Sequence, residues 1–312
     1  MGKIDFHAHY LSPEYVNYLD HYFNGYGDGV ATPKWNVEDH LQLMKDFDID
    51  YSVLSISSPH LSAGSKETTV QLAQDVNGFA ADVADAHPTK FGFFASLPLP
   101  YVDESIKSID EAVSLHAQGF TLPTNVQGTY IGDDSFDAVM AKLNDVNALV
   151  TLHPNAPQPM TSAATDVKVP LMEFFFDTTR TVVNMAQHNI FSKYTNITWL
   201  IPHAGALLPI IAQRISVGGK FLNDGDQEPD DMLEVMGHLY FDTAGMVLPY
   251  QLPTLLKMTT ADKLVYGSDF PYTPNKVVGG LADQLEQTDQ LTDQQKQQIF
   301  SDTARKLIKL PN

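Results

Sequence analysis

Short apolar runs alternate with longer amphipathic stretches along most of this 312-residue chain. The short runs are rich in β-branched and aromatic residues and are bounded by Gly, Pro and Asp, a pattern typical of buried strands. Eight strands are predicted in this way, at residues 3–9, 51–57, 90–97, 119–123, 148–153, 197–203, 239–243 and 264–269. A helical pattern follows each strand, so the chain is predicted to be an α/β protein made of eight β/α units.

The amphipathic stretches carry helix-start residues at the expected places. The clearest predicted helices cover residues 37–47, 67–86, 104–117, 136–144 and 207–215. Asn36 and Asp103 precede two of them as N-caps, and Thr292 with Gln295 fits a capping box before the last helix. Eight such units predict a (β/α)8 TIM barrel.

The residues after the first strand distinguish the barrel from the alternative fold, a doubly wound open sheet. A doubly wound open sheet would place a glycine-rich phosphate loop there. In this chain His9 is followed by Tyr-Leu-Ser-Pro instead. Because the sequence also shows no linker, repeat or low-complexity run, residues 1–312 are predicted to form one domain.

Two connections are longer than simple turns and are predicted to be insertions after strand 1 and strand 5. They cover residues 10–35 and 154–172. Long βα loops of a barrel often cover the active site. The second insertion is rich in proline, at Pro154, Pro157, Pro159 and Pro170, and the first in aromatic residues: Tyr10, Tyr15, Tyr18, Tyr22, Phe23, Tyr26 and Trp35. We expect these tyrosines to pack the insertion itself, the alternative being an aromatic wall for a planar substrate.

The composition and net charge of the chain argue against nucleic acid and anionic membranes as binding partners. Hydrophobic residues make up 43% of the chain and its formal net charge is −19, so it has the composition of a globular protein and lacks the basic surface that nucleic acid or anionic membranes require. There is no apolar run long enough to span a bilayer. The chain has no cysteine, so any metal must be held by His, Asp or Glu, and a cytoplasmic protein is expected.

Four histidines and one aspartate stand at predicted strand ends. His7 and His9 end strand 1, and because a strand has a period of two their imidazoles point the same way. His153 ends strand 5, His203 strand 6 and Asp269 strand 8, and these ends converge on the face where barrel enzymes carry their active sites. Imidazoles and a carboxylate suit a catalytic metal. The remaining histidines are expected to be exposed to solvent: His21, His40, His60, His87, His116, His188 and His238.

The motifs around these residues resemble those of a known family. Asp-Phe-His-Ala-His, Leu-His-Pro, Ile-Pro-His-Ala-Gly-Ala and Tyr-Gly-Ser-Asp-Phe-Pro occur in this order at the ends of strands 1, 5, 6 and 8. This series resembles the amidohydrolase superfamily, and within it the branch of aminocarboxymuconate-semialdehyde, γ-resorcylate and 5-carboxyvanillate decarboxylases. The resemblance implies one divalent metal, zinc before manganese, held by His7, His9, His153 and Asp269, with His203 as the catalytic histidine.

Further features of the resemblance concern lysine and arginine. Binuclear members carry a lysine at the end of strand 4, which here reads Gly-Phe-Thr-Leu-Pro-Thr-Asn, and its absence favours one metal. Arg214 follows His203 by eleven residues, a spacing at which the semialdehyde decarboxylase has an arginine that reaches a neighbouring subunit's substrate carboxylate. The resemblance therefore implies a homodimer in which Arg214 binds substrate. Arg180 is a second candidate for binding the substrate carboxylate. For both arginines the alternative is a structural ion pair, and Arg305 is expected to form such a pair.

The function that the resemblance implies is non-oxidative decarboxylation of a hydroxylated aromatic or related unsaturated carboxylic acid. The proton could come through Asp269, His203 or metal-bound water. The semialdehyde decarboxylase has a further substrate arginine near strand 2, and residues 35–58 contain none, so the same substrate is not expected. The alternative is a hydrolase of a lactone, amide or ester that uses a metal-activated water. A binding protein on an inactive barrel would require a broken ligand set, and none of the five positions is missing.

Overall fold

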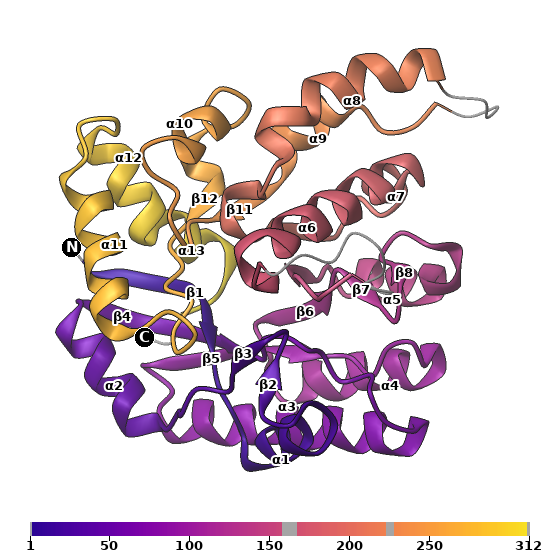
Figure 1. The fold of residues 1–312 in the computed structure, drawn as a ribbon, viewed down its shortest axis with the longest axis vertical. Helices are drawn as coiled ribbons and strands as arrows, with labels where there is room; N and C mark the ends of the chain where they lie inside the picture. Colours follow the sequence, from indigo (N-terminus) through magenta and orange to yellow (C-terminus); the bar gives the residue numbers. More distant parts are fainter. Residues whose placement is uncertain (1, 158–166, 223–227, 311–312) are drawn as a thin grey trace.

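The computed structural model describes residues 2–157, 167–222 and 228–310. Its centre is a sheet of eight parallel strands in the order β1, β4, β5, β6, β9, β10, β11 and β12. The order along the sheet is also the order along the chain (Figure 1). These strands are Lys3–His9 (β1), Ile49–Ser55 (β4), Phe91–Ser96 (β5), Gly119–Pro123 (β6), Leu149–His153 (β9), Thr198–Ile201 (β10), Tyr240–Asp242 (β11) and Leu264–Val265 (β12).

The last strand returns to the first and closes the sheet. Parallel bridges join Asp5 to Tyr266 and Ala8 to Phe270. The backbone N–H of Phe6 donates to the carbonyl of Tyr266 at 2.9 Å, and the N–H of His9 donates to the carbonyl of Phe270 at 2.7 Å. The predicted (β/α)8 TIM barrel is therefore confirmed.

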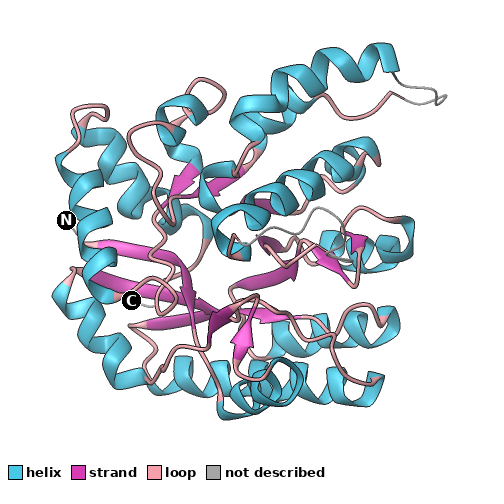
Figure 2. Cartoon of the chain, in the orientation of Figure 1, coloured by secondary structure: helices cyan, strands magenta, loops and turns pink. Residues whose placement is uncertain are grey.

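Helices surround the strands, as Figure 2 shows. They are α1 (Pro13–Phe23), α2 (Val37–Asp46), α3 (Lys66–Ala86), α4 (Val102–Ser114), α5 (Asp137–Asp145), α6 (Val169–Gln187), α7 (Ile190–Lys193), α8 (Leu208–Leu222), α9 (Met232–His238), α10 (Gln251–Leu255), α11 (Asn275–Gln287), α12 (Asp293–Gln297) and α13 (Thr303–Leu307). Within the described residues, no helix is long and apolar enough to cross a membrane.

Two of the three predicted helix starts are confirmed. The Asn36 side chain accepts a hydrogen bond from the backbone N–H of Asp39, and Thr292 with Gln295 forms a complete capping box. The predicted cap at Asp103 is wrong. Helix α4 begins at Val102, so Asp103 lies in its first turn, where its negative charge faces the positive end of the helix dipole.

The predicted strand at 264–269 is too long. β12 ends at Val265, and Asp269 adopts a left-handed backbone with φ 58°. The reason is the barrel closure, because the segment after β12 bonds to the carbonyls and amides of β1 rather than continuing a ladder with β11. The strand predicted at 51–57 begins two residues earlier, at Ile49, and ends at Ser55.

The insertion after β1 is structured, and it holds the loop that follows β4 at the mouth of the barrel. It contains α1 and a small hairpin, β2 (Tyr26–Gly27) and β3 (Val30–Ala31). Tyr15 and Tyr18 are buried, and their hydroxyls donate to the carbonyls of Pro59 at 2.8 Å and His60 at 2.7 Å. These tyrosines pack the insertion, as expected, and they also fix the loop that follows β4.

The insertion predicted after β9 is described only in part. Residues 158–166, which include Pro159, lie outside the described residues. α6 begins at Val169, so Pro170 belongs to its first turn rather than to the loop. This position suits proline, because the first turn of a helix leaves its N–H groups without intrahelical partners. A second small hairpin, β7 (Asn125–Val126) with β8 (Thr129–Tyr130), follows β6.

Candidate metal centre

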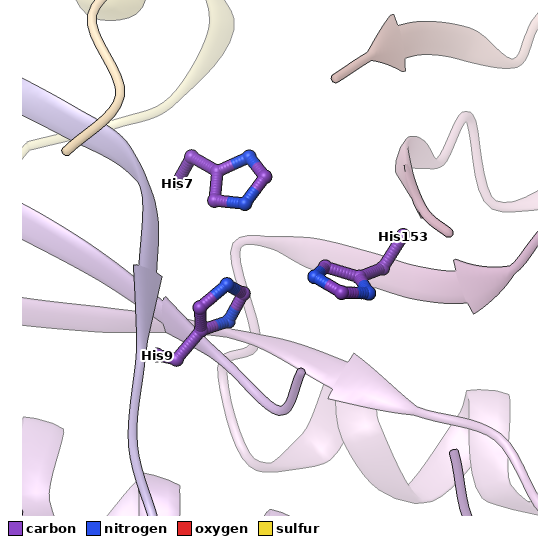
Figure 3. A group of neighbouring side chains, drawn as sticks. All are labelled: His7, His9 and His153. Carbon is purple, nitrogen blue, oxygen red and sulfur yellow. The ribbon is translucent and has the colours of Figure 1, made fainter. Parts of the chain in front are cut away.

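Three histidines from opposite sides of the barrel meet in a buried cluster. One ring nitrogen each of His7, His9 and His153 lies within 4.8 Å of the others. Figure 3 shows His7 and His9 reaching from β1 and His153 facing them from β9. The ring centroids of His7 and His9 are 4.9 Å apart, which confirms that their imidazoles share one face of the strand.

Hydrogen bonds fix the proton on the same nitrogen of each ring. His7 Nδ1 lies 2.8 Å from Asp242 Oδ2, His9 Nδ1 3.3 Å from the carbonyl oxygen of Ser55, and His153 Nδ1 2.9 Å from the carbonyl oxygen of Pro154. Each of these oxygens accepts, so each Nδ1 carries a hydrogen and donates. In the neutral, metal-binding form of each ring the lone pair therefore lies on Nε2, and the Nε2 atoms of His7 and His9 are buried without a hydrogen-bond partner.

Asp269 lies beside the three histidines. Its Oδ1 lies 3.3 Å from His9 Nε2 and 3.7 Å from His7 Nε2, while Thr273 Oγ1 donates to its Oδ2 at 3.1 Å. Ligand atoms about 2.1 Å from a tetrahedral ion are separated by about 3.4 Å. The spacing of these side chains thus fits a divalent metal, and two unpartnered buried nitrogens beside a carboxylate have no better explanation within the described residues.

Asp242 is the residue that the sequence analysis missed. It is fully buried at the end of β11, and while Oδ2 accepts from His7, Oδ1 accepts from the backbone N–H of His203 at 2.8 Å and of Ala244 at 3.0 Å. One carboxylate thereby orients a cluster histidine and the turn that carries His203. Its place at the end of the predicted strand 239–243 was the available signal, the same one that identified Asp269.

The charges around the cluster set its pKa values. Burial alone would lower the pKa of His7, but the carboxylate of Asp242 outweighs it and raises the value to about 9. Burial would raise the pKa of Asp269, whereas the neighbouring imidazoles of His9 and His7 hold it at about 2. Asp269 is therefore a carboxylate at neutral pH, the form that binds a cation.

His203 stands beside the cluster, outside the group of three. Its ring lies 5.1 Å from that of His7 between centroids and stacks on Phe175 at 5.7 Å. Burial and the positive His7 lower its pKa to about 4. Its Nδ1 has no hydrogen-bond partner among the described side chains, so this nitrogen is available to a ligand.

The turn that carries His203 is strained. His203, Ala204 and Ala206 have φ of 54°, 50° and 53°, and such left-handed residues cost on the order of 1 kcal/mol each when they have side chains. The Gln251 amide holds the turn by donating to the carbonyls of His203 at 2.5 Å and Ala206 at 3.1 Å. The left-handed turn therefore gives the His203 side chain a direction that the end of a regular strand would not give it.

Two histidines expected to be exposed are buried instead. His40 has no exposed surface and His60 is 5% exposed, so the expectation of solvent exposure is wrong for both. Trp35 Nε1 donates to His40 Nδ1 at 3.0 Å, and the insertion after β1 covers His60. Burial lowers the pKa of each to about 3. Neither could be recognised from its own neighbours in the sequence, because tertiary packing covers them.

The structure places the two candidate arginines away from the three histidines. Arg180 lies in the second half of α6, with Nη1 3.9 Å from Asp177 Oδ1 and its guanidinium over the ring of Phe176. Arg214 is exposed on α8 and lines a groove of about 760 Å³ between α6 and α8. A substrate-binding role for either arginine stays a prediction.

Comparison with known families agrees with the motifs. The amidohydrolase family profile matches residues 4–310, so the chain belongs to the amidohydrolase family. This confirms the family that the four motifs at the strand ends predicted.

Curated relatives of similar length are decarboxylases by name. The chain is 31% identical to decarboxylase yanB of Aspergillus niger, with 99% of this chain and 88% of that protein covered. It is 28% identical to 6-methylsalicylic acid decarboxylase of Penicillium expansum, with 99% and 96% covered. The branch of the family that the sequence resembles is therefore confirmed as well.

Solved structures agree with the fold. A crystal structure of an amidohydrolase II is 42% identical, with a TM-score of 0.94 and coverage of 98% of this chain and 99% of that one. A dihydroxybenzoic acid decarboxylase from Polaromonas, crystallised with manganese and 2-nitroresorcinol, is 18% identical with a TM-score of 0.84, covering 98% and 96%. The second likeness bears on the fold alone.

Proposed function

We propose that this enzyme is a metal-dependent, non-oxidative decarboxylase of a hydroxylated aromatic carboxylic acid. The observation that carries the proposal is the end-to-end likeness to 6-methylsalicylic acid decarboxylase, which covers 99% of this chain. The buried histidines at the mouth of the barrel support it, since three imidazoles and a carboxylate leave a position for substrate.

In this proposal His7, His9, His153 and Asp269 hold one divalent ion. Such an ion, when bound, supplies Lewis-acid chemistry that polarises the substrate carboxylate and an adjacent hydroxyl oxygen. Asp242 keeps His7 in the tautomer that presents Nε2. The rest of the reaction depends on groups of the chain itself.

The chemical step exchanges carbon dioxide for a proton at one ring carbon. The bond from that carbon to the carboxylate breaks, its electron pair stays on the ring, and a proton is added at the same carbon. His203 and Asp269 are the proposed proton carriers, because Nδ1 of His203 has no partner beside the cluster and the Asp269 side chain is 24% exposed.

The test uses metal-loaded protein and a panel of salicylate, 6-methylsalicylate and 2,6-dihydroxybenzoate. We expect release of labelled carbon dioxide from at least one acid, with formation of the matching phenol. A panel of lactones, amides and esters in a pH-stat serves as the counter-assay. Acid release there without carbon dioxide release from the first panel would overturn the proposal in favour of hydrolysis.

We propose zinc as the native ion, with manganese as the alternative. Imidazole suits zinc, while carboxylate oxygen also suits manganese, so the donor set accepts both. Elemental analysis of the protein as purified decides between them. We expect one equivalent per chain.

We further propose a homodimer that joins through α8, which projects at the top right of Figure 1. On this helix Ile210 is 70% exposed and Val217 52% exposed, and Arg214 lies between them. Exposed apolar side chains on one helix mark an interface, and an outward arginine reaches a second copy more readily than its own barrel. Sedimentation of Ile210→Lys should give monomer, while Gln74→Lys on α3 should leave the dimer intact.

A single domain and a cytoplasmic location remain predictions of the sequence.

A further inference from the structure

A second cavity lies beside the metal centre, at the same end of the barrel. Its volume is about 280 Å³, and four loops at the strand ends line it, from the insertion after β1 and from the segments after β4, β6 and β9. Polar side chains that line it include Asp28, His60, Asn125 and Asn155. Each comes from a different one of these four segments.

The cavity and the centre share the same loops. Ser57 Oγ lies 3.3 Å from His153 Nε2, and two residues further along the chain Pro59 lines the cavity. Asn155, two residues after His153, accepts a hydrogen bond from the backbone N–H of His60 at 3.2 Å. On both loops the lining of the cavity thus begins two residues along the chain from a residue of the metal centre.

Tyr272 lies beside the metal centre. Its ring centroid is 5.6 Å from that of His9. Burial raises the pKa of the Tyr272 phenol, and the carboxylates of Asp269 and Asp28 both add to the rise. The carboxylates of the metal centre and of the cavity are thus both close enough to act on this phenol.

The two amides that line the cavity are already committed to holding its walls. Asn155 Nδ2 donates to the carbonyl of Asn125 at 3.1 Å. Asn125 Nδ2 donates to Asp177 Oδ2 at 2.8 Å, and its Oδ1 accepts from the N–H of Gly128 at 3.2 Å. These amides define the shape of the cavity and have little hydrogen-bonding capacity left for a ligand.

Two other polar atoms have no partner. Asp28 Oδ2 and His60 Nε2 are buried and make no hydrogen bond. His60 as a residue is only 5% exposed. Buried polar groups are normally satisfied, so a pair of unsatisfied atoms lining one cavity points to a ligand. The carboxylate oxygen can only accept, and the imidazole, which burial holds neutral, can accept or donate at Nε2 according to its tautomer, so the complementary ligand group is a hydroxyl that donates to Asp28 and can accept or donate at His60.

We propose that this cavity is a subsite for a substituent on the side of the ring away from the reacting carboxylate, at ring carbon 4 or 5, selecting a hydroxyl group and rejecting a second carboxylate. The inference rests on the proposed decarboxylase function and specifies its substrate class. The hydroxyl donates to Asp28 and contacts His60. A carboxylate at the same place would meet the Asp28 charge at close range, with no arginine among the residues that line the cavity.

The test measures calorimetric dissociation constants for the metal-loaded full chain. The probes are salicylate and its derivatives with hydroxyl, methoxy or carboxylate at ring carbon 4, and the same series at carbon 5. In one series we expect the hydroxyl compound to bind about tenfold or more tightly than the methoxy compound, as a hydrogen bond to a charged group predicts. The carboxylate compound should bind most weakly.

Asp28→Asn keeps the shape of the side chain and removes its charge. We expect the hydroxyl preference to fall below about threefold and the carboxylate compound to gain at least as much as the hydroxyl compound loses. Asp20→Asn, an exposed site on α1 with the same change in charge, should leave both ratios unchanged. His60→Gln is the second variant, and it should reduce the same preference without relieving the rejection of carboxylate.

Failure of this inference is separable from failure of the proposed function. If salicylate or its derivatives release carbon dioxide but both series show no hydroxyl preference, the subsite is refuted and the decarboxylase stands. The same holds if Asp28→Asn keeps the preference of the wild-type protein. If no acid binds or reacts, the proposed function fails and the subsite falls with it.

Discussion

The histidine cluster and the isolated His40 are both buried, yet they present opposite ring nitrogens. In His7, His9 and His153 a protein oxygen accepts from Nδ1, which leaves the lone pair on Nε2. In His40 the Trp35 indole donates to Nδ1, so the lone pair is already used and the hydrogen sits on Nε2. Burial alone therefore does not make a metal ligand. The group that satisfies the other nitrogen decides which histidines can bind an ion.

The largest expected effect comes from removing a member of the cluster. His7→Ala and Asp269→Ala each delete one proposed ligand and leave the others buried without a counterpart. We expect bound metal to fall from one equivalent per chain to below about a tenth after dialysis, with loss of carbon dioxide release. Elemental analysis measures the first, and His40→Gln, which removes a buried histidine outside the cluster, should keep its metal. Full metal content in both alanine variants would refute the ligand assignment.

A smaller effect is expected from Asp242→Asn. Asparagine has one acceptor oxygen. If that oxygen keeps the bonds from the N–H groups of His203 and Ala244, the NH2 group faces His7 Nδ1 and cannot accept from it, so the preference for the Nε2 lone pair weakens. Loss of such an orienting partner typically reduces metal affinity by about 10- to 100-fold. Competition with a chelator measures the dissociation constant. Asp262→Asn, near the start of β12 and partly exposed, is the matched control, and an unchanged affinity in Asp242→Asn would show that the orientation is dispensable.

Gln251→Glu tests whether the strained turn positions His203. The carboxylate keeps the length of the side chain but cannot donate to the carbonyls of His203 and Ala206. We expect kcat for the best acid of the panel to fall by about tenfold, with KM and metal content near wild type. Gln284→Glu on the exposed side of α11 makes the same change in charge and should have no effect. A lower metal content would instead assign Gln251 to general stability.

The smallest effect is the contribution of His40 to acid stability. Its pKa is about 3 in the folded protein and about 6.5 when exposed, so the unfolded chain binds more protons between these values. Stability from this residue is complete above pH 6.5 and is lost as the pH falls, by about 1.4 kcal/mol per pH unit.

Urea unfolding at pH 7, 6 and 5 measures this contribution. His40→Gln should lose less stability on acidification than the wild-type protein, because glutamine can still accept from Trp35 and takes up no proton. His21→Gln, on the exposed side of α1, should follow the wild-type curve. Equal slopes for wild type and His40→Gln would contradict the assignment.

The local pattern of the sequence was enough to predict the fold and the residues of the candidate site. Alternation of strands and helices predicted the barrel, and the strand-end position of His7, His9, His153, His203 and Asp269 predicted the site. The barrel is confirmed, and these five residues lie near one another because the ends of parallel strands must meet at one face of a closed barrel, whatever the loops between them do.

Tertiary structure alone decided the rest. Which nitrogen of His7 is free depends on Asp242, which is 235 positions away in the chain. The burial of His60 depends on tyrosines of the insertion after β1, and the aim of His203 depends on a left-handed turn that Gln251 holds. Such contacts join segments with no fixed spacing in sequence, so the sequence predicts which residues can do the chemistry and the fold decides how they are presented.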